Sequence, residues 1–120
     1  MYDHIGLKVH DLDRSVRFYS AVLGEFGYEV GFRDETTAGL GPKGAPALWL
    51  YAAGSKAIAE VHVAFTADKR TIVDGFHKAG VKHGGRDNGL PGLRADYSPT
   101  YYAAFLIDPD GNNVEAVCLR

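Results

Sequence analysis

The stretch "HIGLKVHDLDRSVRFYSAVLG", residues 4–24, contains a strand pattern followed directly by a helix pattern. Every second residue of Ile5–Val9 is apolar, which predicts a half-buried strand. Asp11 or Asp13 can cap a helix that follows, in which apolar residues recur at helical spacing up to Gly24.

The same order returns in "HVAFTADKRTIVDGFHKAG", residues 62–80. In both copies a strand histidine is followed 14 positions later by a phenylalanine, from 4 to 18 and from 62 to 76. Each half then predicts three further strands, so that the chain is an internal repeat. We expect one domain over 1–120, with module 1 at 1–55 and module 2 at 58–120.

The remaining elements are short. We predict strands at 28–34, 36–41, 47–53, 101–107 and 112–119, a short strand and turn at 81–85, a helix at 67–80, a loop at 86–100 and a turn at 108–111. The loop at 86–100 is rich in glycine and proline.

Composition excludes several classes of protein. Hydrophobic residues make up 46% and charged residues 23% of 120 residues, and the net charge is -2, so neither nucleic-acid binding nor a basic membrane patch is expected. The single cysteine, Cys118, excludes an internal disulfide. Neither a signal peptide nor a membrane-spanning segment is evident, and we expect a cytoplasmic protein.

Three motifs together resemble the vicinal-oxygen-chelate superfamily, which groups glyoxalases, bleomycin resistance proteins and extradiol dioxygenases. They are "DHIGLKVHDLDRSVRFYSAVLG" at the start, "EVHVAF" in the middle and "YYAAFLIDPDGNNVEAV" at the end. The resemblance implies an α+β fold, with two βαβββ modules forming curved half-barrel sheets and helices on the outer face. It also implies modules that pair within one chain or across a homodimer, and we expect a homodimer.

The resemblance further implies metal ligands at His4, His62 and Glu115. Imidazole and carboxylate donors suit a divalent ion (Fe, Mn, Ni, Co or Zn), and three ligands leave positions open for substrate or water. A carboxylate within an apolar strand is costly to bury unless it is paired or bound to metal. Trp49 occupies the fourth ligand position, where glyoxalase I relatives carry a carboxylate, which argues against glyoxalase I activity itself.

Each candidate ligand also has an ordinary explanation. A lone strand histidine is more often a hydrogen-bonded core or surface residue, and Glu115 can instead pair with a lysine or arginine at the rim of a sheet. His10, His77 and His83 are expected at the surface, with His83 at the border of a pocket.

The loop at 86–100 and the strand after it suggest a pocket for a small anionic or aromatic ligand, since loops on a rigid scaffold often carry recognition. The candidate substrate-binding residues are Lys8, Trp49, Arg94, Tyr97, Tyr101 and Tyr102. The ordinary explanation is that the tyrosines pack the loop and that Arg94 pairs with Asp96 or Asp87.

Three functions compete. The first is a metalloenzyme whose substrate chelates the ion through oxygen, the second a metal-free binding protein of the bleomycin-resistance kind, and the third an interaction domain. The sequence favours them in that order and does not identify the catalytic residues or the substrate.

Overall fold

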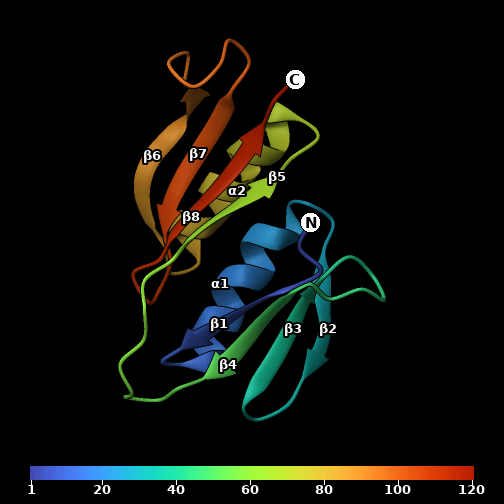
Figure 1. The fold of residues 1–120 in the computed structure, drawn as a ribbon, viewed down its shortest axis with the longest axis vertical. Helices are drawn as coiled ribbons and strands as arrows, with labels where there is room; N and C mark the ends of the chain where they lie inside the picture. Colours follow the sequence, from blue (N-terminus) through green and yellow to red (C-terminus); the bar gives the residue numbers. More distant parts are fainter.

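Two copies of a βαβββ arrangement make up the chain in the computed structural model, which describes residues 1–120 (Figure 1). Module 1 comprises β1 (Ile5–Val9), α1 (Leu12–Gly24), β2 (Glu29–Arg33), β3 (Thr37–Gly41) and β4 (Leu48–Ala52). Module 2 comprises β5 (His62–Thr66), α2 (Arg70–Lys82), β6 (Arg86–Leu93), β7 (Tyr102–Ile107) and β8 (Asn113–Cys118). The repeat predicted from the sequence is therefore confirmed.

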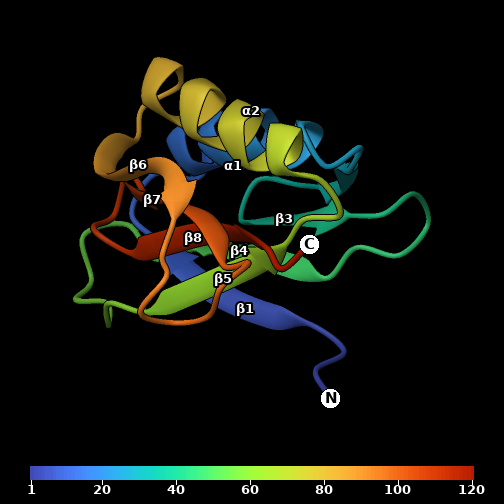
Figure 2. The same ribbon diagram turned by 90° about the horizontal axis from the view of Figure 1, so that it is seen from above.

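Each module forms one four-stranded sheet. Sheet 1 has the order β1-β4-β3-β2 and sheet 2 the order β5-β8-β7-β6, so β1 and β5 are both edge strands. In each sheet the first and last strands of the module run parallel and the other neighbours run antiparallel. Helices α1 and α2 lie together over one face of the sheets, and the opposite face of each sheet, its open face, is left uncovered by helices (Figure 2).

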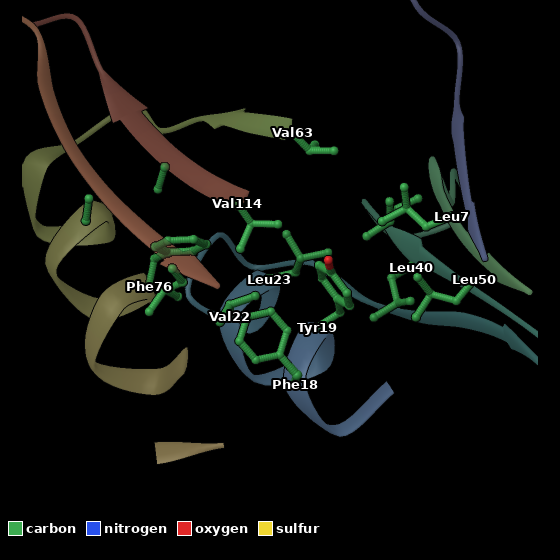
Figure 3. Close-up of a cluster of buried hydrophobic side chains, with 14 of the residues drawn as sticks. Leu7, Phe18, Tyr19, Val22, Leu23, Leu40, Leu50, Val63, Phe76 and Val114 are labelled. Atoms are coloured by element: carbon green, nitrogen blue, oxygen red, sulfur yellow. The ribbon is translucent and has the colours of Figure 1, made fainter. Parts of the chain in front are cut away.

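A single apolar core of 20 buried residues joins the two modules. Figure 3 shows side chains of α1, among them Tyr19 and Leu23, between Val63 and Val114 of sheet 2 and the leucines of sheet 1. Burying a side chain of this size contributes about 1.5–3 kcal/mol relative to leaving it exposed. Helix α1 therefore stabilises both sheets and not only its own.

A buried polar cluster, here called the Asp108 clasp, ties module 2 to α1. The Asp108 carboxylate, 3% exposed, accepts hydrogen bonds from the Tyr19 hydroxyl at 2.5 Å and from the side-chain amide of Asn112 at 2.9 Å. It also accepts from the backbone N–H groups of Asp110 and Asn112, which closes the turn between β7 and β8. Burial, followed by the charge of Asp108, raises the pKa of Tyr19 well above its usual value, so this hydroxyl stays a donor.

The second half of the clasp is Asp110, whose carboxylate accepts from the backbone N–H of His10 and from the Ser15 hydroxyl, both at 3.0 Å. The two acidic residues of the turn thus contact α1 and the segment that leads into it. Buried polar groups that satisfy one another in this way fix a single arrangement of the elements they join.

Two predictions for the segment 81–100 are wrong. Residues 81–85 are predicted as a short strand and a turn; the turn is present at 83–84, but helix α2 continues past Gly80 to Lys82, so the strand does not form. The predicted loop at 86–100 begins with strand β6, whose pairing with β7 is irregular at Gly89 and Gly92. Because β6 is an edge strand, it tolerates Pro91 and the irregular pairing that would exclude it from the centre of a sheet.

His77 was expected at the surface, but its residue is only 8% exposed. It lies four positions after Val73, which places both on the buried side of α2. Its Nε2 is 2.8 Å from Oδ1 of Asp87 in β6, and the hydrogen bond from His77 lowers the pKa of the Asp87 carboxyl. The pair therefore fastens β6 to the helix.

Removing the phenolic oxygen of Tyr19 tests the clasp. We expect Tyr19→Phe to lower the free energy of unfolding by about 1–2 kcal/mol, because Asp108 loses one of its donors. Asp108→Ala should cost about 3–5 kcal/mol, since several buried groups lose their partner. Urea unfolding followed by tryptophan fluorescence measures both. Tyr2→Phe removes the same atom from a residue that is 77% exposed and should change stability by less than about 0.5 kcal/mol; an equal effect of the two Tyr→Phe changes would contradict the role of the clasp.

Candidate functional site

The open face of sheet 2 carries a compact polar cluster. Alternation along the strands places Val63 of β5 and Val114 of β8 toward the helices, and therefore His62 and Glu115 on the open face. Phe105 lies opposite Glu115 in the β7–β8 pairing and so shares this face.

His62 and Glu115 contact each other directly. Nε2 of His62 is 3.1 Å from Oε1 of Glu115; the histidine side chain is 50% exposed and the glutamate side chain 3%. Nδ1 of His62 lies 3.0 Å from the backbone oxygen of Asn113. A carbonyl oxygen only accepts hydrogen bonds, so Nδ1 carries a proton, and Nε2, when it is protonated, donates to Oε1 of the carboxylate.

Tyr101 holds the other oxygen of this carboxylate. Its hydroxyl donates to Oε2 of Glu115 at 2.5 Å, and its ring meets the ring of Tyr97 edge-on at 5.0 Å. The hydrogen bond to Glu115, with burial as a smaller cause, raises the pKa of Tyr101 to about 12. The phenol therefore remains protonated at neutral pH, and Oε1 is the oxygen of Glu115 that faces His62.

The positions and hydrogen bonds of His62 and Glu115 are those expected of two side chains that bind one divalent ion. Metal-binding histidines typically donate their second ring N–H to a carbonyl or carboxylate, as His62 does to Asn113, and ligating carboxylates are themselves hydrogen-bonded, as Glu115 is by Tyr101. Metal–nitrogen and metal–oxygen bonds of about 2.1 Å at a right angle place the two donor atoms about 3 Å apart, close to the observed 3.1 Å.

The third predicted ligand, His4, lies elsewhere. His4 was predicted to be a strand residue, but strand β1 begins at Ile5, so His4 precedes the strand. It is exposed, and its Nδ1 is 2.7 Å from Oδ1 of Asp3. No group of three or more His, Cys, Asp or Glu side chains in the chain is placed to hold one ion. His4 instead borders a mostly apolar cavity of about 270 Å³, whose wall also includes Val63 and Phe65 of β5.

Tyr101, directly before β7, and Tyr102, its first residue, face opposite ways, as expected for adjacent residues of an extended chain. While Tyr101 reaches Glu115, the Tyr102 hydroxyl donates to Asp74 of α2 at 2.5 Å, and its ring lies under Arg70 at 5.1 Å. Tyr102 therefore packs against the helix, away from the candidate ligands.

Lys8 and Trp49 lie in sheet 1, and no hydrogen bond or ion pair joins either of them to the cluster on sheet 2. Lys8 is exposed. The Trp49 ring lies over Gly39, where an added Cβ would come within 2.7 Å of it, and 5.8 Å from the ring of Phe32. This open face is therefore aromatic, and glycine lets the tryptophan lie flat on it.

One protein family and several solved structures are similar to this chain. The family model described as the Glyoxalase/Bleomycin resistance protein/Dioxygenase superfamily matches residues 2–116. A glyoxalase/bleomycin resistance protein from Albidiferax ferrireducens T118 has a TM-score of 0.85, with 29% sequence identity over 98% of both chains. A putative glyoxalase from Bacillus halodurans has a TM-score of 0.73, with 26% identity over 98% of this chain and 95% of that one.

A glyoxalase I mutant from Zea mays has a TM-score of 0.70 at 24% identity, over 97% of this chain and 46% of the maize chain, a similarity that concerns the fold alone. No protein of curated function matches the sequence. No helix of the chain is long and apolar enough to cross a membrane.

Alkaline titration tests the bond between Tyr101 and Glu115. A pKa raised from 10.0 to about 12 means that the folded protein holds the phenolic proton more tightly than the unfolded chain. The contribution of Tyr101 to stability is thus complete below about pH 10 and lost as the pH rises toward 12. We expect Tyr101→Phe to be less stable than the wild type by about 1 kcal/mol at neutral pH, with the difference shrinking over that range, as measured by urea unfolding. Tyr97→Phe, which changes a neighbouring phenol with no hydrogen-bond partner on its hydroxyl, should show no such pH dependence; a constant difference for Tyr101→Phe would contradict the bond.

Proposed function

Because this chain belongs to the glyoxalase/bleomycin resistance protein/dioxygenase superfamily, we propose that it is a metal-dependent enzyme whose small-molecule substrate binds the ion through oxygen atoms. The observation that carries the proposal is the cluster of His62 and Glu115, with each group oriented by a second partner. A nearly buried carboxylate on an apolar strand is costly without a compensating charge; His62 supplies one when it is protonated, and a divalent ion bound by both side chains would supply two.

In the proposed mechanism His62 and Glu115 hold the ion, which when bound supplies Lewis acidity or, as Fe(II), oxygen chemistry. Tyr101 keeps its proton and fixes Oε2 of Glu115, which leaves Oε1 on the side of His62, where it would serve as a ligand. The Asn113 carbonyl holds the imidazole with Nε2 toward Oε1 of Glu115. The aromatic Trp49 at the matching position of module 1 neither binds metal nor transfers protons, and so glyoxalase I activity itself is not proposed.

We further propose that the site is completed in a homodimer, with His4 supplied by a second copy of the chain. Within one chain no third ligand joins His62 and Glu115. Strands β1 and β5 each pair on one side only, which leaves the edge next to each histidine free for another chain.

The second candidate function is metal-free binding of a small aromatic molecule. It is favoured by the open face of sheet 1, where Phe32, Trp49 and Tyr51 are partly exposed and Gly6 and Gly39 let rings lie flat. The two functions differ in whether a divalent ion binds.

Metal analysis of protein prepared without a chelating tag decides between them. We expect about one divalent ion per chain in the wild type. His62→Ala and Glu115→Gln should each weaken metal binding more than about 100-fold, since losing an outer partner alone costs about 10- to 100-fold. Both variants should keep the wild-type circular dichroism, and His83→Ala, which changes a histidine bonded only to the end of α2, should bind the ion normally. A wild-type protein that takes up none of Fe, Mn, Co, Ni or Zn would refute the metalloenzyme proposal.

Mixing two defective variants tests the shared site. His4→Ala and Glu115→Ala should each bind the ion weakly when alone. In a mixed dimer one of the two sites has all its ligands, so random pairing should restore tight binding to about a quarter of the sites. Titration of the co-refolded mixture measures this fraction. If the mixture binds no better than the separate variants, the ligands are not shared between copies.

A further inference from the structure

Arg94 follows β6 and lies on the open face of sheet 2, with its guanidinium carbon 5.4 Å from the centre of the Phe105 ring. Its Nη1 donates to the backbone oxygen of Gly92 and its Nη2 to that of Leu90, both at 2.8 Å. The side chain is therefore held at both of its terminal nitrogens by the strand that precedes it.

The backbone of β6 is shaped around this side chain. A Cβ at Gly89 would lie 3.2 Å from Nη2 of Arg94, and a Cβ at Gly92 would lie 3.3 Å from Nη1. At either distance the guanidinium would have to shift by a few tenths of an ångström. Gly89 and Gly92 suggested a loop in the sequence. In the structure they leave the space that the Arg94 guanidinium occupies.

The charge of Arg94 has no partner in the chain. None of the five ion pairs includes it, and the pairs suggested by the sequence, with Asp96 or Asp87, do not form. A guanidinium has five N–H groups, of which the structure engages two. The half-buried cation therefore presents unused donors to whatever occupies the open face.

Phe105 connects this cation to the candidate ligands. Its ring stacks on the His62 ring at 6.4 Å with 20° between the planes, and its residue pairs with Glu115 across β7 and β8. His62, Glu115, Phe105 and Arg94 therefore form a row across sheet 2, with the carboxylate and imidazole at one end and the guanidinium at the other.

We propose that Arg94 is an oxyanion subsite of the candidate active site, so that the substrate carries a carboxylate or phosphate group beside the oxygen atoms that chelate the ion. The proposal rests on the proposed function, because it places the chelating end of the substrate at His62 and Glu115. A planar guanidinium binds carboxylate and phosphate through paired hydrogen bonds, and anchoring on two carbonyls lowers the entropy lost on binding. The flat Phe105 ring supports the part of the substrate between its two polar ends.

Three compounds that share a metal-chelating hydroxamate group and differ at their other end test the subsite on the metal-loaded protein. Acetohydroxamate ends in a methyl group, succinic monohydroxamate in a carboxylate, and 3-phosphonopropanehydroxamate in a phosphonate. Calorimetric titration gives the dissociation constant of each with the wild type, Arg94→Gln, Arg94→Lys and Arg86→Gln. Arg86, an exposed arginine at the other end of β6 with no hydrogen bond or ion pair from its side chain, is the matched control.

We expect at least one anionic hydroxamate to bind the wild type about 10- to 100-fold more tightly than acetohydroxamate, as charged hydrogen bonds allow. The better of the two identifies carboxylate or phosphate as the group recognised. Arg94→Gln should abolish this preference without changing the affinity for acetohydroxamate or for the ion. Arg94→Lys should keep part of the preference, and Arg86→Gln all of it.

The outcomes separate the two proposals. A wild-type protein that binds the ion and all three hydroxamates equally, or an anion preference that survives in Arg94→Gln, would overturn the Arg94 subsite alone. A wild-type protein that binds no ion in the preceding metal titration would refute the proposed function, and with it the substrate class drawn from it.

Discussion

The buried Asp108 carboxylate fixes how the two halves of this chain meet. It takes four hydrogen bonds: one from Tyr19 of α1, two from backbone N–H groups of its own turn, and one from the side chain of Asn112. Asn112 in turn accepts from the backbone N–H of Val61, immediately before β5. One acidic group thereby sets the turn, the position of α1 against module 2, and the start of the strand that carries His62. Because each donor is itself buried or part of a turn, the arrangement has few alternatives of similar energy.

The candidate site inherits its geometry from this clasp. Asn113 directly follows Asn112, and its carbonyl oxygen accepts a hydrogen bond from Nδ1 of His62. Glu115 lies two residues further along the same strand. The orientation of the imidazole is thus a consequence of where β8 begins. Tyr101 closes the arrangement from the start of β7 by engaging the second oxygen of the carboxylate. Sites built on strands with such outer partners keep their geometry better than sites built on loops alone.

Alternation and repeat spacing are local properties, and they predicted most of the strands, both helices and the repeat, whereas the two half-barrel sheets and the set of His4, His62 and Glu115 came from the family resemblance. The sequence did not predict where His4 would lie, since alternation specifies a face of a strand and not the distance between two sheets. It also failed for β6, where Gly89 and Gly92 suggested a loop. Their role depends on the guanidinium of Arg94, whose contacts with them and with Phe105 of a neighbouring strand follow from strand pairing that a single sequence does not specify.

The two modules have kept one fold and differ at matching positions. Trp49 lies opposite Gly6 in the β1–β4 pairing, as Glu115 lies opposite Ala64 in the β5–β8 pairing, and each facing residue comes two positions after its module's histidine. At this position one module carries an aromatic ring and the other a nearly buried carboxylate. An apolar ring lowers the local polarity without binding an ion, whereas a carboxylate attracts a cation, whether a protonated imidazole or a metal ion. Equivalent strands thus carry different residues at one position. As a result, the open face of module 1 favours contact with apolar groups, and that of module 2 favours binding of a cation.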